Sequence, residues 1–317
     1  MHYAEAKRVF ADEIASLQAV AVALEPTFDR AVELCLSCPG KIVVTGIGKS
    51  GIIGHKIAAT LASTGSPSVF LNAGEALHGD MGVVSREDVV LMLSNSASTP
   101  ELQKMLPSIR KIGARLIGFF GATDTVLAEG MDVVLDLSVE REACPLNLAP
   151  MTSATVALVA GDALASALMV ARGFTQEDFA VYHPGGSLGR RLLYRVEDVM
   201  KKGPALPVVA PGQSLREAIE ALAAGRLGAV LVCGPGERLE GILVEGDVRR
   251  HYLEQTSPDL PVGEAMTRGP KVIGPEALLG DALAEMETGD RKVYVLPVVD
   301  GEGVLRGLLR MHDIVGL

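Results

Sequence analysis

The chain has 317 residues, a formal net charge of −10 and 48% hydrophobic residues. This length allows two domains with cores of their own, and the hydrophobic content is typical of globular proteins. The acidic balance excludes nucleic acid as an expected partner, because a phosphate backbone calls for basic patches and the sequence carries only isolated Arg-Arg pairs.

The N-terminal segment "MHYAEAKRVFADEIASL" has mixed charges and no apolar run, so no signal peptide is expected. The segment 154–171 is apolar, but Asp162 near its centre would be costly in a bilayer, which favours a buried helix and no membrane partner. Cys35 and Cys38 form a C-x-x-C without a second pair, so they are interpreted as residues at a helix end. We expect a cytoplasmic protein without metal or cofactor.

Apolar residues at helical spacing predict one or two helices within residues 4–36. From residue 41, five β-rich runs alternate with helical stretches, and a long helix is predicted over 152–172. The five runs are "KIVVTG", "PSVFLN", "DVVLMLSNS", "RLIGFFG" and "MDVVLDLS". This alternation predicts a parallel sheet covered by helices on both faces, a three-layer α/β domain.

A glycine-rich turn, "GIGKSG" at 46–51, lies between the first strand and the next helix. It matches the dinucleotide fingerprint, but the following strand ends in Asn72 where an acidic residue is needed. A nucleoside triphosphate loop would need glycine where Val43 stands. What remains is a helix start whose amides favour an anion. The ligand contacts expected in this turn are Gly48, Lys49, Ser50 and Gly51.

A second turn, within "LSNSASTPEL", leads from a strand into a helix with Pro100 near its start. Because carboxyl ends of parallel strands meet at one edge, both turns together predict a site for a small phosphorylated molecule. The hydroxyls expected to bind its phosphate are Ser94, Ser96 and Thr99. For Ser98 a capping box with Glu101 is favoured, which requires no ligand.

Three further side chains are candidates for chemistry, each with an ordinary alternative. Lys49 can reach an anion or a developing oxyanion, and otherwise is a surface lysine. Glu142, in "REACPLNLAP" after the last strand, suits a general base, and otherwise is a solvated charge paired with Arg141. His183, in "YHPGGSLGRR", suits proton transfer but is otherwise an inert loop residue.

The C-terminal part contains an internal repeat. "VEDVM" and "VGEAM" begin two similar segments, and the landmark pairs 200 and 266, 241 and 307, and 247 and 313 all lie 66 residues apart. Two equivalent units are expected to pack on each other, since neither buries its apolar face alone. The predicted domains are 1–195, 196–256 and 257–317.

Several segments together resemble the arabinose-5-phosphate isomerase family, in which a sugar isomerase (SIS) domain precedes paired CBS units. They are "GIGKSGIIGHKIAATLASTGSPS", "GEALHGDMG", "SNS", "REACPLNLAP", "GDALA" and "ARGFTQEDFAVYHPGGSLGRRLL", in this order. The resemblance implies a metal-independent homotetramer that interconverts D-arabinose 5-phosphate and D-ribulose 5-phosphate, supplying 3-deoxy-D-manno-octulosonate for lipopolysaccharide or capsule. It implies Lys49, Glu101, Glu142 and His183 as catalytic residues, and Gly65, Ser66 and His78 as substrate contacts.

The sequence departs from the family pattern at three places. Asn72 replaces a histidine linked to inhibitory zinc, and Ala97 replaces a glycine of the serine turn. The CBS motifs "GILVEGD" and "GLLRMHD" keep Asp247 and Asp313 but lack the usual hydroxyl, which weakens the case for adenine nucleotides. The resemblance still allows a small-molecule effector at the CBS pair.

An aldose–ketose isomerisation passes through an ene-diol and needs a base, a donor to the carbonyl oxygen and help in ring opening. We hypothesise that Glu142 is the base, that His183 exchanges protons with ring or carbonyl oxygen, and that Lys49 stabilises negative charge. Glu101 would orient a sugar hydroxyl or Lys49. The alternatives are a non-catalytic sugar-phosphate sensor and an isomerase for another sugar phosphate. An aminosugar synthase is disfavoured, because "MHYAE" offers no amide-hydrolysing nucleophile.

Overall fold

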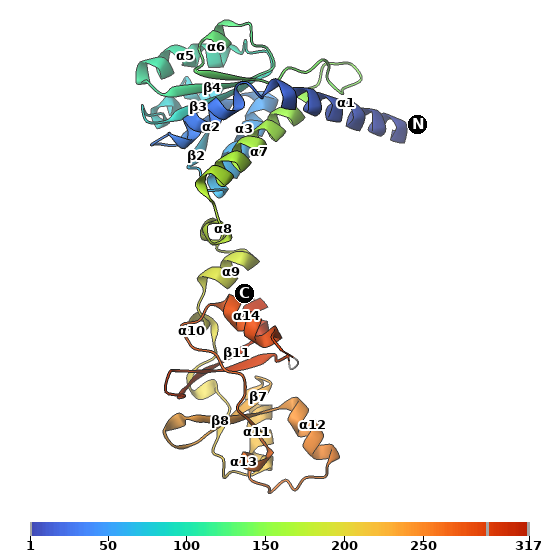
Figure 1. Cartoon of the computed structure of the whole chain (residues 1–317), viewed down its shortest axis with the longest axis vertical. Coiled ribbons are helices and arrows are strands. Elements are labelled where there is room, and N and C mark those ends of the chain that lie inside the picture. Colours follow the sequence, from blue (N-terminus) through green and yellow to red (C-terminus); the bar gives the residue numbers. More distant parts are fainter. Residues whose placement is uncertain (1, 290–291, 316–317) are drawn as a thin grey trace. The chain divides into compact units, whose positions relative to one another are not determined.

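The computed structural model describes residues 2–289 and 292–315. The chain divides into two compact units, Met1–Tyr182 and His183–Leu317, and each is described by itself (Figure 1). The predicted domain boundaries after residues 195 and 256 stay predictions.

The first unit contains a five-stranded sheet in the order β2-β1-β3-β4-β5, and every pair is parallel. Its strands are β1 (Ile42–Gly46), β2 (Ser68–Asn72), β3 (Val89–Ser94), β4 (Arg115–Phe120) and β5 (Val133–Asp136). The chain moves from β1 outward to β2 and then returns to the other side of β1, so the strand order reverses between β1 and β3. Ligands of open parallel sheets bind outside the carboxyl ends at such a reversal.

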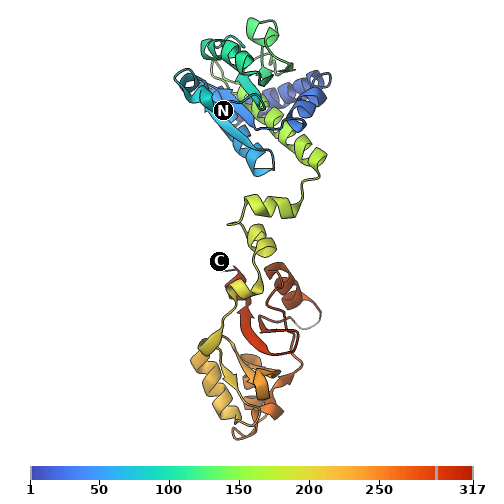
Figure 2. The ribbon, with the colours of Figure 1, turned by 90° about the vertical axis from the view of Figure 1, so that its left-hand side faces the viewer.

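Helices cover both faces of this sheet, which confirms the predicted three-layer fold (Figure 2). One face packs against α1 (His2–Ala23), α2 (Phe28–Leu36), α3 (Gly48–Ser63) and α7 (Thr152–Arg172). The other face packs against α4 (Ala73–Ala76), α5 (Pro100–Ile112) and α6 (Val126–Glu129). The 3₁₀ turn η1 (Asp80–Val83) follows α4. Neighbouring residues of β1 alternate between the two cores: Val43 belongs to the second and Val44 to the first.

Helix α7 has the length and apolarity of a membrane span, by composition alone. Val156, Leu164 and Leu168 are nevertheless buried in the core shared with α3. Asp162, whose charge argued against a bilayer, forms an ion pair with Lys56 of α3. The helix is thus a core helix of the first unit, as predicted for 152–172.

The second unit contains a four-stranded sheet in the order β6-β7-β8-β9 and a two-stranded sheet of β10 and β11. The strands are β6 (Val208–Val209), β7 (Ala229–Cys233), β8 (Leu239–Val244), β9 (Thr267–Arg268), β10 (Val295–Val299) and β11 (Leu305–Arg310). Its helices include α9 (Ser187–Leu193), α11 (Leu215–Gly225), α12 (Glu245–Leu253), α14 (Leu279–Glu287) and α15 (Met311–Val315). Helix α8 (Gln176–Tyr182) closes the first unit, and α10 (Val196–Val199) and α13 (Val262–Ala265) begin the two halves of the repeat.

The two repeats pack on each other, as their equivalence predicts, and they also exchange strands. Thr267, at the start of the second repeat, pairs with Ile242 in the sheet of the first. At the equivalent positions 66 residues away, Lys201 pairs with Leu308. A shared core joins Leu231 of the first repeat to Leu308 of the second. Each repeat therefore completes the sheet of the other.

Candidate active site

The glycine turn places Lys49 at the carboxyl end of β1. Helix α3 begins at Gly48, whose φ of +59° lies in the left-handed region, which explains the glycine. The preceding residue, Ile47, has no polar side chain with which to cap the first amides of α3. Uncapped amides at a helix start, beside an exposed lysine, form a favourable place for an anion.

The serine turn lies at the carboxyl end of the neighbouring strand, β3. The hydroxyls of Ser94 and Thr99 are 2.8 Å apart and hydrogen-bonded, and Ser96 Oγ accepts from the amide and hydroxyl of Ser98. Ala97, buried at the centre of the turn, has a φ of +45°, a conformation that costs a non-glycine residue energy. The turn therefore presents several hydroxyls at the reversal between β1 and β3.

The predicted capping box of Ser98 and Glu101 is wrong. Helix α5 begins at Pro100, and Thr99 is its N-cap without a side-chain hydrogen bond. Proline fits the first helical position because it lacks an N–H, and this places Ser98 one residue before the cap. Glu101 is half-buried in the first turn of α5.

A small cavity brings the two turns together. Lys49 and Ser50 from the first turn line it with Ser94 and Asn95 from the second, and Ser153 at the start of α7 completes its polar wall. Its volume is about 50 Å³, which is room for one or two water molecules. A sugar phosphate in this place must extend beyond these walls.

Glu142 lies directly behind Ser153. Glu142 is 8% exposed, and its Oε2 accepts hydrogen bonds from the amides of Met151 (2.7 Å) and Ser153 (3.2 Å). Oε1 accepts from Ser153 Oγ. The alternative of a solvated charge paired with Arg141 is wrong, because this carboxylate is buried against the amino terminus of α7.

The loop before α7 is also fixed by hydrogen bonds. The amide of Glu142 donates to Asn147 Oδ1 at 2.7 Å, and Asn147 has a φ of +54°. The amide of Ala143 donates to Thr152 Oγ1 at 2.8 Å. Ser153, Asn147 and Asn95 are not among the site residues predicted from the sequence. "MTSATVAL" does carry Thr and Ser before an apolar helix, which is a helix-start signature.

Other predicted contacts lie elsewhere. Gly65 and Ser66 precede β2, at the amino edge of the sheet, where Ser66 is buried and accepts a hydrogen bond from Arg172. His78 is exposed after α4. His183 is the first residue of the second unit. These assignments stay predictions. Gly51 is buried, and a Cβ there would lie 3.1 Å from the carbonyl oxygen of Gly46, so it serves helix–strand packing.

Asn72, which departs from the family pattern, has a structural role. It is the N-cap of α4, and its Oδ1 accepts from the amide of Gly74 at 2.8 Å. In residues 2–289 and 292–315, no cluster of three or more His, Cys, Asp or Glu side chains is arranged to hold a metal ion.

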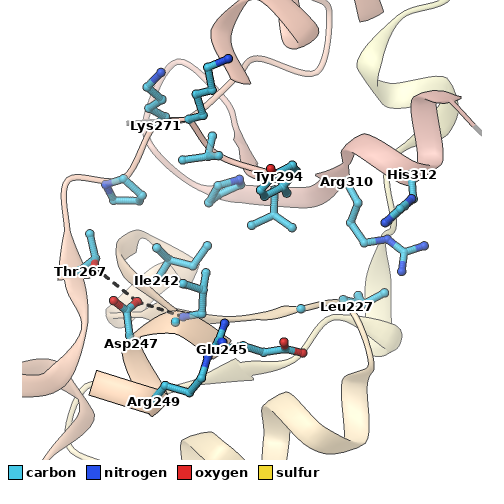
Figure 3. A pocket seen from close by; sticks show the side chains of 18 of the residues that line it. Leu227, Ile242, Glu245, Asp247, Arg249, Thr267, Lys271, Tyr294, Arg310 and His312 are labelled. Atoms are coloured by element: carbon cyan, nitrogen blue, oxygen red, sulfur yellow. Dashed lines mark hydrogen bonds between the residues drawn. The ribbon is translucent and has the colours of Figure 1, made fainter. Parts of the chain in front are cut away.

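The second unit holds a cavity of about 650 Å³ between the two repeats (Figure 3). Apolar side chains from both repeats, among them Ile242 and Val295, form part of its wall. Lysine and arginine side chains outnumber acids in the lining. The cations are Arg226, Arg249, Lys271, Lys292 and Arg310, joined by His312, and the acids are Glu245 and Asp247.

The two motif aspartates of the repeats are already engaged. Asp247 is buried and accepts hydrogen bonds from the amide of Val244 (3.1 Å) and from Arg250 (2.7 Å). Burial alone would raise the pKa of Asp313, but hydrogen bonds and charge from Arg310, with the charge of Lys201, hold this pKa below its ordinary value. These partners occupy most of the acceptor positions of both carboxylates.

Comparisons with known proteins agree with this architecture. The SIS domain family matches residues 35–167, and the CBS domain family matches 196–254 and 262–317. The arabinose 5-phosphate isomerase KdsD of Pseudomonas aeruginosa is 49% identical over 289 residues, which cover 91% of this chain and 88% of that protein. The protein of the same name from Escherichia coli K12 is 43% identical over 310 residues, 98% of this chain and 94% of that one.

Solved structures match the first part of the chain. The structure of c3406 from Escherichia coli CFT073, in complex with arabinose 5-phosphate, is 44% identical and has a TM-score of 0.55. It covers 56% of this chain, and 95% of that chain is matched. A phosphosugar isomerase involved in capsule formation from Bacteroides fragilis is 38% identical with a TM-score of 0.50, covering 54% of this chain and 94% of that one.

Proposed function

The chain belongs to the arabinose 5-phosphate isomerase family and is an aldose–ketose isomerase, and we propose the following assignment of its parts. The substrate pair is D-arabinose 5-phosphate and D-ribulose 5-phosphate, and the enzyme acts in the cytoplasm to supply 3-deoxy-D-manno-octulosonate. The observation that carries this assignment is the junction of the glycine turn, the serine turn and the Glu142 segment at one edge of the sheet.

The two turns hold the sugar phosphate. The uncapped start of α3 and the hydroxyls of Ser94, Ser96 and Thr99 provide donors for a dianion, and Gly48, Ser50 and Gly51 shape the turn around it. Lys49 adds a mobile positive charge at the same cavity. When the proton moves between C1 and C2, negative charge develops on the ene-diol oxygen, and the ammonium group stabilises it.

Glu142 is the base that moves this proton. A carboxylate offers about four acceptor positions, and three are used by Met151 and Ser153. The remaining position accepts the proton from carbon. His183 exchanges protons with the ring or carbonyl oxygen, and Glu101 orients a sugar hydroxyl or Lys49.

We infer that neighbouring subunits complete the site. A cavity of about 50 Å³ cannot enclose a five-carbon phosphate, and Gly65 and Ser66 lie at the opposite edge of the sheet. We assign a homotetramer in which neighbouring subunits bring Gly65, Ser66 and His78 to this edge.

Substrate conversion by the wild-type protein and by two variants tests the assignment. The wild-type protein is incubated with a panel of aldose 5- and 6-phosphates and ketose formation is followed. Conversion of arabinose 5-phosphate is expected to exceed that of the others, and Glu142→Gln is expected to lose turnover while still binding the phosphate. Arg141→Gln, adjacent in sequence, is the matched control and should retain activity. A fully active Glu142→Gln would refute the assignment of Glu142 as the base. Binding of the sugar phosphate without turnover by the wild-type protein would indicate a non-catalytic sensor.

We also assign an effector to the cavity of the CBS pair: a small anion with an apolar portion. Lys271, Lys292 and Arg310 form ion pairs with acids outside the lining. Arg226 and Arg249 therefore provide the positive charge that favours an anion. The apolar wall provides a surface for the rest of the molecule (Figure 3). The engaged state of Asp247 disfavours ligands recognised through that carboxylate.

Thermal unfolding with added anions tests the effector. AMP and pyrophosphate are titrated separately, and saturation should raise Tm because ligands stabilise the state that binds them. The double variant Arg226→Ala/Arg249→Ala should lose this shift. Arg216→Ala, on the exposed side of α11 and outside the lining, should keep it. An equal shift in all three proteins would place binding elsewhere, and the absence of any shift would contradict an anionic effector of these classes.

A further inference from the structure

Ser153 supplies two of the three hydrogen bonds that hold Glu142. Its hydroxyl donates to Oε1, and its amide donates to Oε2 at 3.2 Å. The third comes from the amide of Met151, also to Oε2. Since Oε2 accepts two bonds and Oε1 one, the acceptor position left over belongs to Oε1. The hydroxyl of Ser153 therefore sets the direction in which this last position faces.

We propose that Ser153 is a positioning residue for the isomerisation, which acts by orienting the Glu142 carboxylate. This proposal rests on the proposed role of Glu142 as the base. Proton transfer from carbon requires the acceptor oxygen in contact with the substrate, and a displacement of about 1 Å can cost about 100-fold in rate. A side chain that fixes the oxygen thus contributes to turnover without touching the reacting atoms.

The location of Ser153 supports this role. It lines the cavity together with Lys49 and Ser94, whereas Glu142 lies behind it and is 8% exposed. Ser153 therefore contacts both the cavity and the Glu142 carboxylate, and the residue is 7% exposed.

The neighbouring hydroxyl has a different task. Thr152 Oγ1 accepts from the amide of Ala143 and so holds the backbone of the loop. Met151 is the N-cap of α7 and has no side-chain cap, so the carboxylate of Glu142 receives the first amides of this helix instead. Of the two hydroxyls at this helix start, only that of Ser153 reaches the carboxylate. Thr152 therefore stabilises the loop, whereas Ser153 orients the carboxylate.

Steady-state kinetics of Ser153→Ala and Ser153→Thr test the proposal. In Ser153→Ala, kcat is expected to fall about 10- to 100-fold, with KM for arabinose 5-phosphate changed by less than about 2-fold, because the phosphate-binding turns are intact. Ser153→Thr keeps a hydroxyl and should restore most of kcat.

Thr125→Ala is the matched control. Thr125 is the N-cap of α6, and its Oγ1 accepts from the amide of Ala128 at 3.2 Å, outside the cavity lining. Loss of this cap should lower Tm to a similar or greater extent while kcat stays unchanged. A Ser153→Ala protein with wild-type kcat would overturn the proposal. So would a loss of kcat that comes with lower Tm and is not rescued by threonine.

Glu142→Gln separates this proposal from the one on which it rests. If Glu142→Gln turns over normally, the assignment of the base fails, whatever Ser153 does. If Glu142→Gln is inactive and Ser153→Ala is normal, the base stands and the positioning role alone is refuted. Both variants being impaired, with rescue by Ser153→Thr, is the outcome that the structure leads us to expect.

Discussion

The packing of α3 on α7 sets the distance between the lysine and the carboxylate segment, and Gly161 is the residue that permits it. A Cβ at Gly161 would lie 2.4 Å from Cγ1 and 2.5 Å from Cδ1 of Ile57. Carbon atoms in contact are about 3.5–4.0 Å apart. The methyl group of Gly161→Ala therefore needs about 1 Å or more of movement by Ile57 or by one helix.

The effect on stability follows from two opposing quantities. Alanine in a helix interior is favoured over glycine by about 0.8–1.0 kcal/mol, while overpacking a core costs about 1–3 kcal/mol. We expect Gly161→Ala to lower the free energy of unfolding of the first unit by about 1 kcal/mol. Denaturant unfolding measures this change. Gly246→Ala in α12, where a Cβ would have nothing within 4 Å, controls for helix propensity and should not destabilise.

The effect on activity should be larger. Ile57 lies eight residues after Lys49 on α3, and Gly161 lies eight residues after Ser153 on α7. This is about 12 Å along each helix, so a shift at the crossing is transmitted to both helix starts. We expect kcat/KM to fall about 10-fold or more.

A double-mutant cycle with Ile57→Ala checks the cause. That change removes Cγ1 and Cδ1, together with Cγ2 at 3.2 Å. Its own cavity cost of about 2–5 kcal/mol should be partly offset when the new methyl group of Gly161→Ala fills the space. The favourable coupling expected is about 1 kcal/mol or more. A Gly161→Ala protein with unchanged stability and kinetics would refute the close packing of these helices.

Two further predictions concern buried polar groups of the first unit. Thr45 Oγ1 is buried without a partner in the described part of the chain. Thr45→Val should therefore raise the free energy of unfolding by about 1 kcal/mol. A lower stability of this variant in denaturant unfolding would contradict the prediction. Burial would raise the pKa of Asp88, but hydrogen bonds from Lys41 and Ser85 hold this pKa below its ordinary value. The resulting stabilisation is present above the unfolded-state pKa of about 4 and disappears as pH falls through the folded-state pKa. Asp88→Asn should therefore have a lower free energy of unfolding at neutral pH, and this free energy should depend less on pH in the acid range.

Much of the first unit was predictable because its signals are local. All five strands and the long helix α7 lie where their apolar runs predicted them. The meeting of the two turns was predictable too, since carboxyl ends of parallel strands share an edge. The hydrogen bonds of Glu142 were not predictable, because they depend on where the loop after β5 returns to α7. Nothing in "REACPLNLAPMTS" specifies that return except Asn147, whose positive φ is visible only in the folded chain.

The capping-box error has a similar cause. Ser98 and Glu101 have the right spacing, but the same sequence also places a proline at Pro100, and two helix-start signals one residue apart cannot both be satisfied. The proline prevails because the residue before a proline is disfavoured in the helical conformation. Thr99 is accordingly extended, with φ −61° and ψ 117°, and cannot be the first helical residue that a Ser98 cap requires. Ser98 instead donates to Ser96, and this keeps the hydroxyls of the turn together.

The internal repeat does not by itself determine which leading segment packs on which repeat. Gly241 and Gly307 are equivalent, and a Cβ at either would lie about 2.5 Å from a methionine sulfur, that of Met266 or Met200 respectively. In both cases the methionine belongs to the segment that leads into the other repeat. A pairing in which each repeat kept its own leading segment would bury the same residue types at the same spacing of 66. The repeat alone therefore does not distinguish exchanged from unexchanged pairings, and the strand pairs of Thr267 with Ile242 and of Lys201 with Leu308 show the exchanged one.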